Sequence, residues 1–176
     1  MKKLLISTLC VTAFTLTACD KKTNESTVKG NEASSTAATT VSLSQDNQAH
    51  IKSDLQLIQT LSNNKAQDAL KFQTEATEAA QRGEQPDLKA IASKLETYVN
   101  DFNKELDALK LQSSEGDALR STLKESNEIS LELTKAGSSN PPDAAKIAEL
   151  QKKATDLQQK LLSDTQALEL KANNKA

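Results

Sequence analysis

Apolar residues recur at steps of three and four along most of the chain, a spacing that places them on one face of an α-helix. The first such stretch covers residues 44–82 and is followed by Gly83, which suits the backbone conformation just after a helix end. Its repeating positions are Ile51, Leu55, Ile58, Leu61 or Ser62, Ala69, Phe72, Ala76 and Ala80. The pattern predicts a long amphipathic helix whose later turns are rich in alanine, so that a partner helix can approach them closely.

A second stretch has the most regular apolar spacing in the chain. It starts at Pro86, a favourable first-turn residue, with Asp87 beside the positive end of the helix dipole. The apolar positions are Leu88, Ile91, Leu95, Tyr98, Phe102, Leu106 and Leu109. A half-buried strand would alternate with a period of two, so this stretch predicts a helix.

The third stretch is set apart by Ser113, Ser114, Glu115 and Gly116, which predict a break in the helix. The apolar face then resumes at Leu119, Leu123, Ser126, Ile129 or Ser130, and Leu133, and Gly137 ends it. The alternative is one continuous helix through residues 110–118, because a single glycine inside a helix costs only about 1 kcal/mol.

A fourth helix is predicted after the pair Pro141 and Pro142. Asn140 is a good N-cap residue, proline suits the first turn, and Asp143 complements the helix dipole. The apolar positions are Ile147, Leu150, Ala154, Leu157, Leu161 and Leu168, with Asp164 or Thr165 at the missing step.

Four helices with short connections predict an all-α fold, an elongated antiparallel four-helix bundle spanning residues 44–174. If the second and third helices are continuous, a three-helix coiled coil results instead. In the four-helix arrangement the first and fourth helices are the longest. We therefore expect them to extend beyond the others as a two-helix neck at the end where the chain enters the bundle.

The first residues form an export signal rather than part of the fold. Lys2 and Lys3 precede a mostly apolar stretch, residues 4–16, which is shorter than the roughly 20 residues needed to span a bilayer. Small residues follow it, as at a signal cleavage site. The stretch Leu16-Thr17-Ala18-Cys19 then resembles the lipobox of bacterial lipoproteins.

That resemblance implies a lipid anchor on Cys19. In such proteins the cysteine sulfur receives a diacylglycerol, the signal peptide (here residues 1–18) is cut between Ala18 and Cys19, and the new amino group is acylated, commonly with palmitate. Asp20 resembles the signal that retains enteric lipoproteins in the inner membrane. The resemblance therefore favours a periplasm-facing lipoprotein of the inner membrane slightly over one of the outer membrane.

Residues 20–43, after the predicted lipid site, are mostly small and polar. Val28, Val41 and Leu43 are the only large apolar side chains among them. Burying so few apolar side chains cannot offset the conformational entropy that the segment would lose on ordering. We therefore expect residues 19–43 to be a lipidated cysteine followed by a flexible linker.

Composition and charge exclude several classes of function. The formal net charge of −2 gives no basic footprint for a nucleic acid. The acidic balance gives no attraction to anionic headgroups, so the lipid must hold the chain at the membrane. One histidine and two cysteines leave little for metal or nucleophilic chemistry. We therefore expect no enzyme activity and no cofactor.

Two groups of residues are candidate sites. His50 has Asp46 and Asp54 one helical turn away on either side, but a solvated helix face is the simpler interpretation of this trio, and we predict no metal site. Phe72, Tyr98 and Phe102 could line a small ligand pocket or could fill the core between helices.

The function predicted from these features is a lipid-anchored cell-envelope lipoprotein. Its bundle would serve as a non-catalytic interaction, adaptor or structural module in the periplasm, with an envelope protein as partner. The alternative is a carrier that holds a small apolar ligand between the helices, near the three aromatic residues.

Overall fold

The computed structural model describes residues 42–82 and 85–173, and within them four helices make up most of the chain. These are α1 (Gln48–Arg82), α2 (Gln85–Ala108), α3 (Ser114–Ser138) and α4 (Ala144–Asn173). The predicted all-α four-helix bundle is confirmed. The signal peptide, Cys19 and nearly all of the predicted linker lie outside the described residues.

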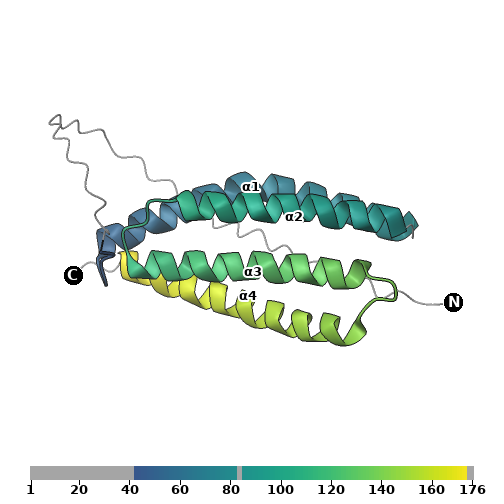
Figure 1. Ribbon diagram of the computed structural model, residues 1–176. Coiled ribbons are helices and arrows are strands. Elements are labelled where there is room, and N and C mark those ends of the chain that lie inside the picture. The colour runs from purple at the N-terminus through teal and green to yellow at the C-terminus, as the bar shows by residue number, and fades with distance from the viewer. Residues whose placement is uncertain (1–41, 83–84, 174–176) are drawn as a thin grey trace.

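The helices form an elongated antiparallel bundle in two layers, α1 beside α2 and α3 beside α4 (Figure 1). α1 packs on α2 and α4, and α3 packs on the same two helices. One end of the bundle therefore holds the start of α1, the α2–α3 connection and the end of α4. We call it the junction end, and the opposite end the far end.

The predicted break between the second and third helices is confirmed, and the continuous-helix alternative is wrong. α2 ends at Ala108 and α3 begins at Ser114. Ser113 is the N-cap of α3, with an extended backbone and a side-chain oxygen that accepts a hydrogen bond from the backbone N–H of Gly116 at 3.0 Å. Such a cap satisfies one of the N–H groups that a helix start leaves without a partner.

The predicted start of the first helix is four residues too early. Asp46 has a φ of 56°, which lies outside the helical region, and α1 begins only at Gln48. The Asn47 side-chain oxygen accepts a hydrogen bond from His50 N–H at 3.1 Å and so caps the helix. Residues 43–47 are therefore a separate short segment, which we call the strap.

The predicted N-cap of the fourth helix is also wrong. α4 begins at Ala144, and the carboxylate of Asp143, rather than Asn140, accepts from Lys146 N–H at 3.0 Å. A proline disfavours helical geometry at the residue before it, so Pro142 keeps Pro141 out of the helix and delays its start.

The apolar core of the described residues includes three clusters. At the junction end, residues of α1, the α2–α3 connection, α3 and α4 meet: Ile51, Ile58, Leu111, Leu119, Leu161 and Leu168. In the far half, Leu95 and Val99 of α2 pack on Leu131 of α3. Toward the far end, Ile129 and Ala136 of α3 pack on Leu150 and Leu157 of α4.

The expected two-helix neck does not form. Leu111 belongs to the same cluster as Ile51, near the start of α1, and Leu168, near the end of α4. The α2–α3 connection therefore covers the ends of the two long helices, and the burial of Leu111 favours this closed arrangement.

Candidate functional site

The most unusual side chain in the structure is Asp54, a carboxylate with no exposed surface on the inner face of α1. It accepts four contacts from two residues of the α2–α3 connection. Gln112 N–H lies 2.9 and 3.1 Å from its two oxygens, and Ser113 donates its N–H at 2.7 Å and its hydroxyl at 2.6 Å. Burying a carboxylate is costly unless hydrogen bonds replace water, and here they do.

Asp54 also lies at the start of α3. Ser113, the N-cap of that helix, is fully buried, and its hydroxyl donates to Asp54 while accepting from Gly116 N–H. A negative charge at a helix N-terminus is favoured by the helix dipole. Asp54 of α1 therefore extends the cap of α3 from a position 59 residues earlier in the chain.

Gly116 is required by this close approach. A Cβ atom built on Gly116 would lie 2.5 Å from an Asp54 carboxylate oxygen and 2.7 Å from the Asp54 Cβ. Any larger residue must push the carboxylate away from its partners. The sequence marked Gly116 as a helix break, whereas the structure uses it to admit a side chain from another helix.

Arg120 holds the other side of the α2–α3 connection. Its guanidinium lies 3.4 Å from the backbone oxygens of both Leu106, in the last turn of α2, and Leu109, just after that helix, and pairs with Asp117 one turn earlier in α3. A basic group at a helix C-terminus interacts favourably with the unpaired carbonyls there. The end of α2 and the start of α3 are thus both held by side chains from outside the connection.

The strap lies along the outside of the same connection. Ser44 and Ser113 form a short parallel bridge, in which Ser44 N–H donates to Gln112 O and Ser114 N–H donates to Ser44 O, both at 2.9 Å. The Ser44 hydroxyl lies 3.1 Å from Gln112 O and 2.8 Å from His50 Nδ1. The backbone of Gln112 is therefore hydrogen-bonded through its C=O to the strap and through its N–H to Asp54.

Charged groups join the strap to the end of α4. Asp46 N–H donates to a Glu115 oxygen at 2.9 Å, and the Lys171 ammonium lies 2.6 Å from Asp46 and 3.5 Å from Glu115. Burial alone would raise the pKa of Glu115, but hydrogen bonds from the backbone of Asp46 and Glu115 and from the side chains of Ser114 and Lys171 lower it overall. The hydrogen bond to Asp46 raises the pKa of Lys171.

The trio of Asp46, His50 and Asp54 does not converge on one point. Asp46 pairs with Lys171, His50 contacts Ser44, and Asp54 faces the α2–α3 connection. Within residues 42–82 and 85–173, no group of three or more histidine, cysteine or acidic side chains is arranged to hold a metal ion.

The three aromatic residues contact one another between α1 and α2. The ring centroids of Phe72 and Tyr98 are 5.2 Å apart, and those of Tyr98 and Phe102 are 6.0 Å apart. The Tyr98 hydroxyl donates to Lys65 O at 3.1 Å. Burial, with further contributions from the charges of Asp68 and Glu105, raises the pKa of Tyr98 to about 12.

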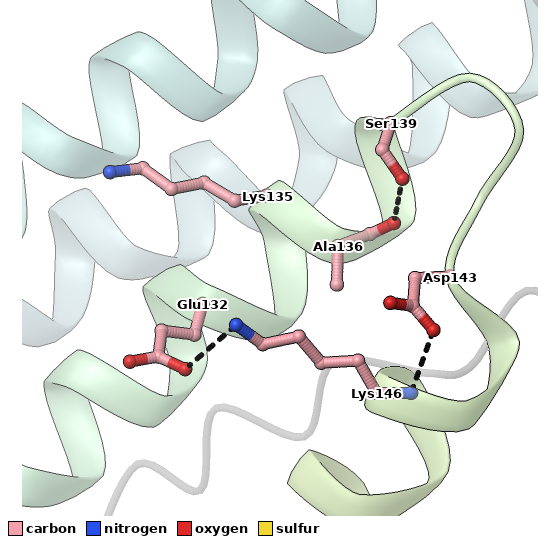
Figure 2. A pocket seen from close by; sticks show the side chains of 6 residues that line it. All are labelled: Glu132, Lys135, Ala136, Ser139, Asp143 and Lys146. Carbon is pink, nitrogen blue, oxygen red and sulfur yellow. Dashed lines mark hydrogen bonds and ion pairs between the residues drawn. The ribbon is translucent and has the colours of Figure 1, made fainter.

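A hollow lies elsewhere, at the α3–α4 turn of the far end (Figure 2). It is lined by Glu132, Lys135, Ala136, Ser139, Asp143 and Lys146. Its two lysines already have carboxylate partners, since Lys146 lies 3.6 Å from Glu132 and Lys135 lies 2.7 Å from Glu96 of α2. None of the candidate ligand or metal residues predicted from the sequence lines this hollow.

Sequence reasoning found Asp54 but gave it the wrong surroundings. Asp54 follows Ile51 by three residues, so it occupies a position on the apolar face of α1. A carboxylate at such a position signals a buried acceptor that needs donors from elsewhere in the fold. Its donors come from Gln112 and Ser113, too far along the chain for local spacing to indicate them.

The lipid-related residues Ala18, Cys19 and Asp20 lie outside the described part of the chain, so the cleavage site, the lipidation and the membrane preference stay predictions. Of the four helices that the structure describes, none combines the length and the apolar character needed to cross a bilayer.

Comparison with known proteins gives a match over the folded body. A family model described as "Uncharacterised lipoprotein PM1805" matches residues 52–174, which is most of the chain and excludes the signal region. No curated protein and no solved structure matches the chain. The predicted resemblance to bacterial lipoproteins is confirmed by a part of the sequence on which it did not depend. The chain belongs to the lipoprotein family that this model describes, uncharacterised lipoprotein PM1805.

Proposed function

We propose that this lipoprotein is a non-catalytic interaction module of the periplasm, anchored through lipid on Cys19 and presenting its helix faces to an envelope protein. Membership of a lipoprotein family supports the lipid anchor. Two or more acyl chains make membrane attachment stable, whereas a single chain gives only marginal binding. The role of the bundle is then to present a surface within reach of that anchor.

The observation that carries this proposal is that the chain enters the bundle at one end only. The strap, which follows the predicted linker in the sequence, lies at the junction end, and α1 then runs to the far end. With a rise of 1.5 Å per residue, helices of 24 to 35 residues extend the bundle by roughly 36 to 52 Å from that point. Such a rod can present its sides and far end well away from the attachment point.

A second support is that the chemically distinctive side chains make contacts within the fold. Asp54 caps α3, His50 contacts the strap, and Tyr98 donates its hydroxyl to Lys65 O. The alternative of a ligand carrier has less support, because the Tyr98 ring packs against the rings of both Phe72 and Phe102.

The proposal is tested by photo-crosslinking in living cells, with the full chain carrying a photoreactive residue at one exposed position at a time. Suitable positions are Leu57 and Leu70 of α1 and Leu162 and Leu170 of α4, all at least 38% exposed. We expect crosslinks to one envelope protein from positions that share a face. If every position yields no crosslink while the chain is lipidated, the proposal is wrong.

The Cys19→Ser variant is the matched control for the anchor. We expect it to carry no acyl chains and to keep residues 1–18, because the cut before Cys19 follows lipidation. An unaltered protein whose Cys19 carries no acyl chains by mass spectrometry would contradict lipid attachment there. Density separation of the membranes then tests Asp20: replacing it by serine is expected to move the protein from the inner to the outer membrane.

A further inference from the structure

The strap contacts every part of the junction end although it belongs to none of the helices. Ser44 is bonded through its backbone to Gln112 and Ser114, Asp46 N–H donates to Glu115, and the Asp46 carboxylate pairs with Lys171 near the end of α4. These partners lie 68 to 125 residues away along the sequence. The strap therefore joins segments that the chain itself does not connect.

The α2–α3 connection lies between two sets of hydrogen bonds. Gln112 N–H donates inward to Asp54 of α1, while Gln112 O accepts outward from Ser44 N–H. Ser113 donates inward to Asp54, and the next residue, Ser114, donates outward to Ser44 O. Displacing the strap leaves the outward groups of this connection without their partners and weakens the hold of the connection on α1.

In the sequence, the strap lies between the predicted linker and α1. Any displacement of the linker reaches residues 43–47 before it reaches the first helical hydrogen bond of α1, from Ile51 N–H to Asn47 O at 2.9 Å. Without the strap, the start of α1 alone would take that displacement, and helix ends fray readily.

We propose that the strap fastens the linker to the whole junction end, so that the start of α1, the α2–α3 connection and the end of α4 open together rather than one at a time. The role of the strap in the cell rests on the proposed lipid anchor at Cys19. The coupling itself is a property of the folded chain and is measurable without the lipid.

The test is hydrogen–deuterium exchange with mass spectrometry on the full lipidated chain in nanodiscs. Ser44→Pro removes one bridge donor and the hydroxyl, and Ser42→Pro is the matched control, an exposed residue two positions earlier. We expect Ser44→Pro to speed exchange about tenfold in residues 48–54, 112–116 and 168–173 together, the effect of losing one or two hydrogen bonds. Residues 129–150 at the far end and the Ser42→Pro variant should be unchanged.

Two outcomes overturn the proposal: faster exchange confined to residues 43–47, or equal effects of the two proline variants. If Ser44→Pro prevents folding, Ser44→Ala and Asp46→Asn provide the same test with smaller expected effects in the same segments. The full chain with Cys19→Ser should keep the exchange pattern of the unaltered protein. Failure of the lipid anchor and failure of the strap are therefore separate results.

Discussion

The junction end and the far end of this bundle are held together in different ways. At the junction end, one apolar cluster takes residues from α1, α3, α4 and the α2–α3 connection, and the buried Asp54 adds a polar centre. Toward the far end, among the side chains that the structure describes, Ile129 and Ala136 of α3 pack with Leu150 and Leu157 of α4. The junction-end cluster thus draws on three helices and the α2–α3 connection, whereas the described far-end cluster joins α3 to α4.

Exposed ion pairs also join the helices in the far half. Lys94 pairs with Glu75 between α2 and α1, Lys135 with Glu96 between α3 and α2, and Lys146 with Glu132 between α4 and α3. All of these side chains are exposed, and exposed pairs contribute about 0 to 1 kcal/mol each. We therefore expect the buried, fully bonded polar group, rather than the number of charges, to set where the bundle is most stable.

Replacing Asp54 by alanine should have the largest effect. The change leaves Gln112 N–H, Ser113 N–H and the Ser113 hydroxyl without their acceptor, and each buried unsatisfied group costs about 1 to 3 kcal/mol. We expect the free energy of unfolding to fall by about 4 kcal/mol, measured by urea denaturation followed by circular dichroism. Asp101→Ala, an exposed position on α2, is the control and should change it by less than about 0.5 kcal/mol. A loss below about 1 kcal/mol for Asp54→Ala would contradict the role given to that carboxylate.

Two glycines of α3 give the next comparison. Gly116→Ala places a methyl group against Asp54 and should lower the free energy of unfolding by about 2 kcal/mol, because overpacking displaces the carboxylate. Gly137→Ala meets no atom within 4 Å and should raise it by about 0.5 kcal/mol, because alanine is the better helix former. The same denaturation measurement applies to both variants. Equal effects at the two glycines would show that the close approach to Asp54 has no energetic weight.

A smaller effect is expected at high pH from Tyr98, between α1 and α2. Its pKa is about 12 in the folded protein, against 10.0 for the ordinary side chain, because of burial and of nearby Asp68 and Glu105. The unfolded chain therefore loses this proton first, and the free energy of unfolding should fall as the pH rises from 10 to 12. The lysines also lose protons in this pH range, so the same measurement on Tyr98→Phe gives their contribution alone. The free energy of unfolding of this variant should fall less steeply with pH. Parallel curves for the two proteins would contradict the raised pKa.

The smallest effect should come from the exposed ion pairs of the far half. Lys135→Gln removes the pair with Glu96 at 2.7 Å but leaves the stem of the side chain in place. We expect a loss of no more than about 0.5 kcal/mol, and less in 1 M salt, where exposed charges are screened. A loss as large as that of Gly116→Ala would mean that ion pairs, and not packing, hold the far half together.

Local spacing was sufficient to predict the helices and most of the core. Leu119, Leu150, Leu157, Leu161 and Leu168 were placed on apolar faces and are buried. Val99 and Leu131 were missed, because a helix with two neighbours buries a wider face than one stripe of positions.

The junction end could not be predicted from spacing, because its contacts join distant parts of the chain. Ser44 meets Gln112, and Asp46 meets Lys171, without any shared periodicity that would align them. The local signals were present but ambiguous: Asp54 lies on an apolar face, and Gly116 lies three residues after a serine. Neither signal indicates which residue lies opposite it. The sequence therefore predicted a break at residues 113–116 but not the contact with Asp54.

The most direct test of the difference between the two ends is amide hydrogen exchange of the unaltered protein, resolved along the chain by NMR. The slowest amides should lie in residues 51–58, 119–123 and 161–168, at the junction end, and should open only with global unfolding. Amides of residues 129–136 and 150–157 should exchange faster, through local opening of the far half. If the far half exchanges as slowly as the junction end, or more slowly, the proposed stable centre around Asp54 is wrong.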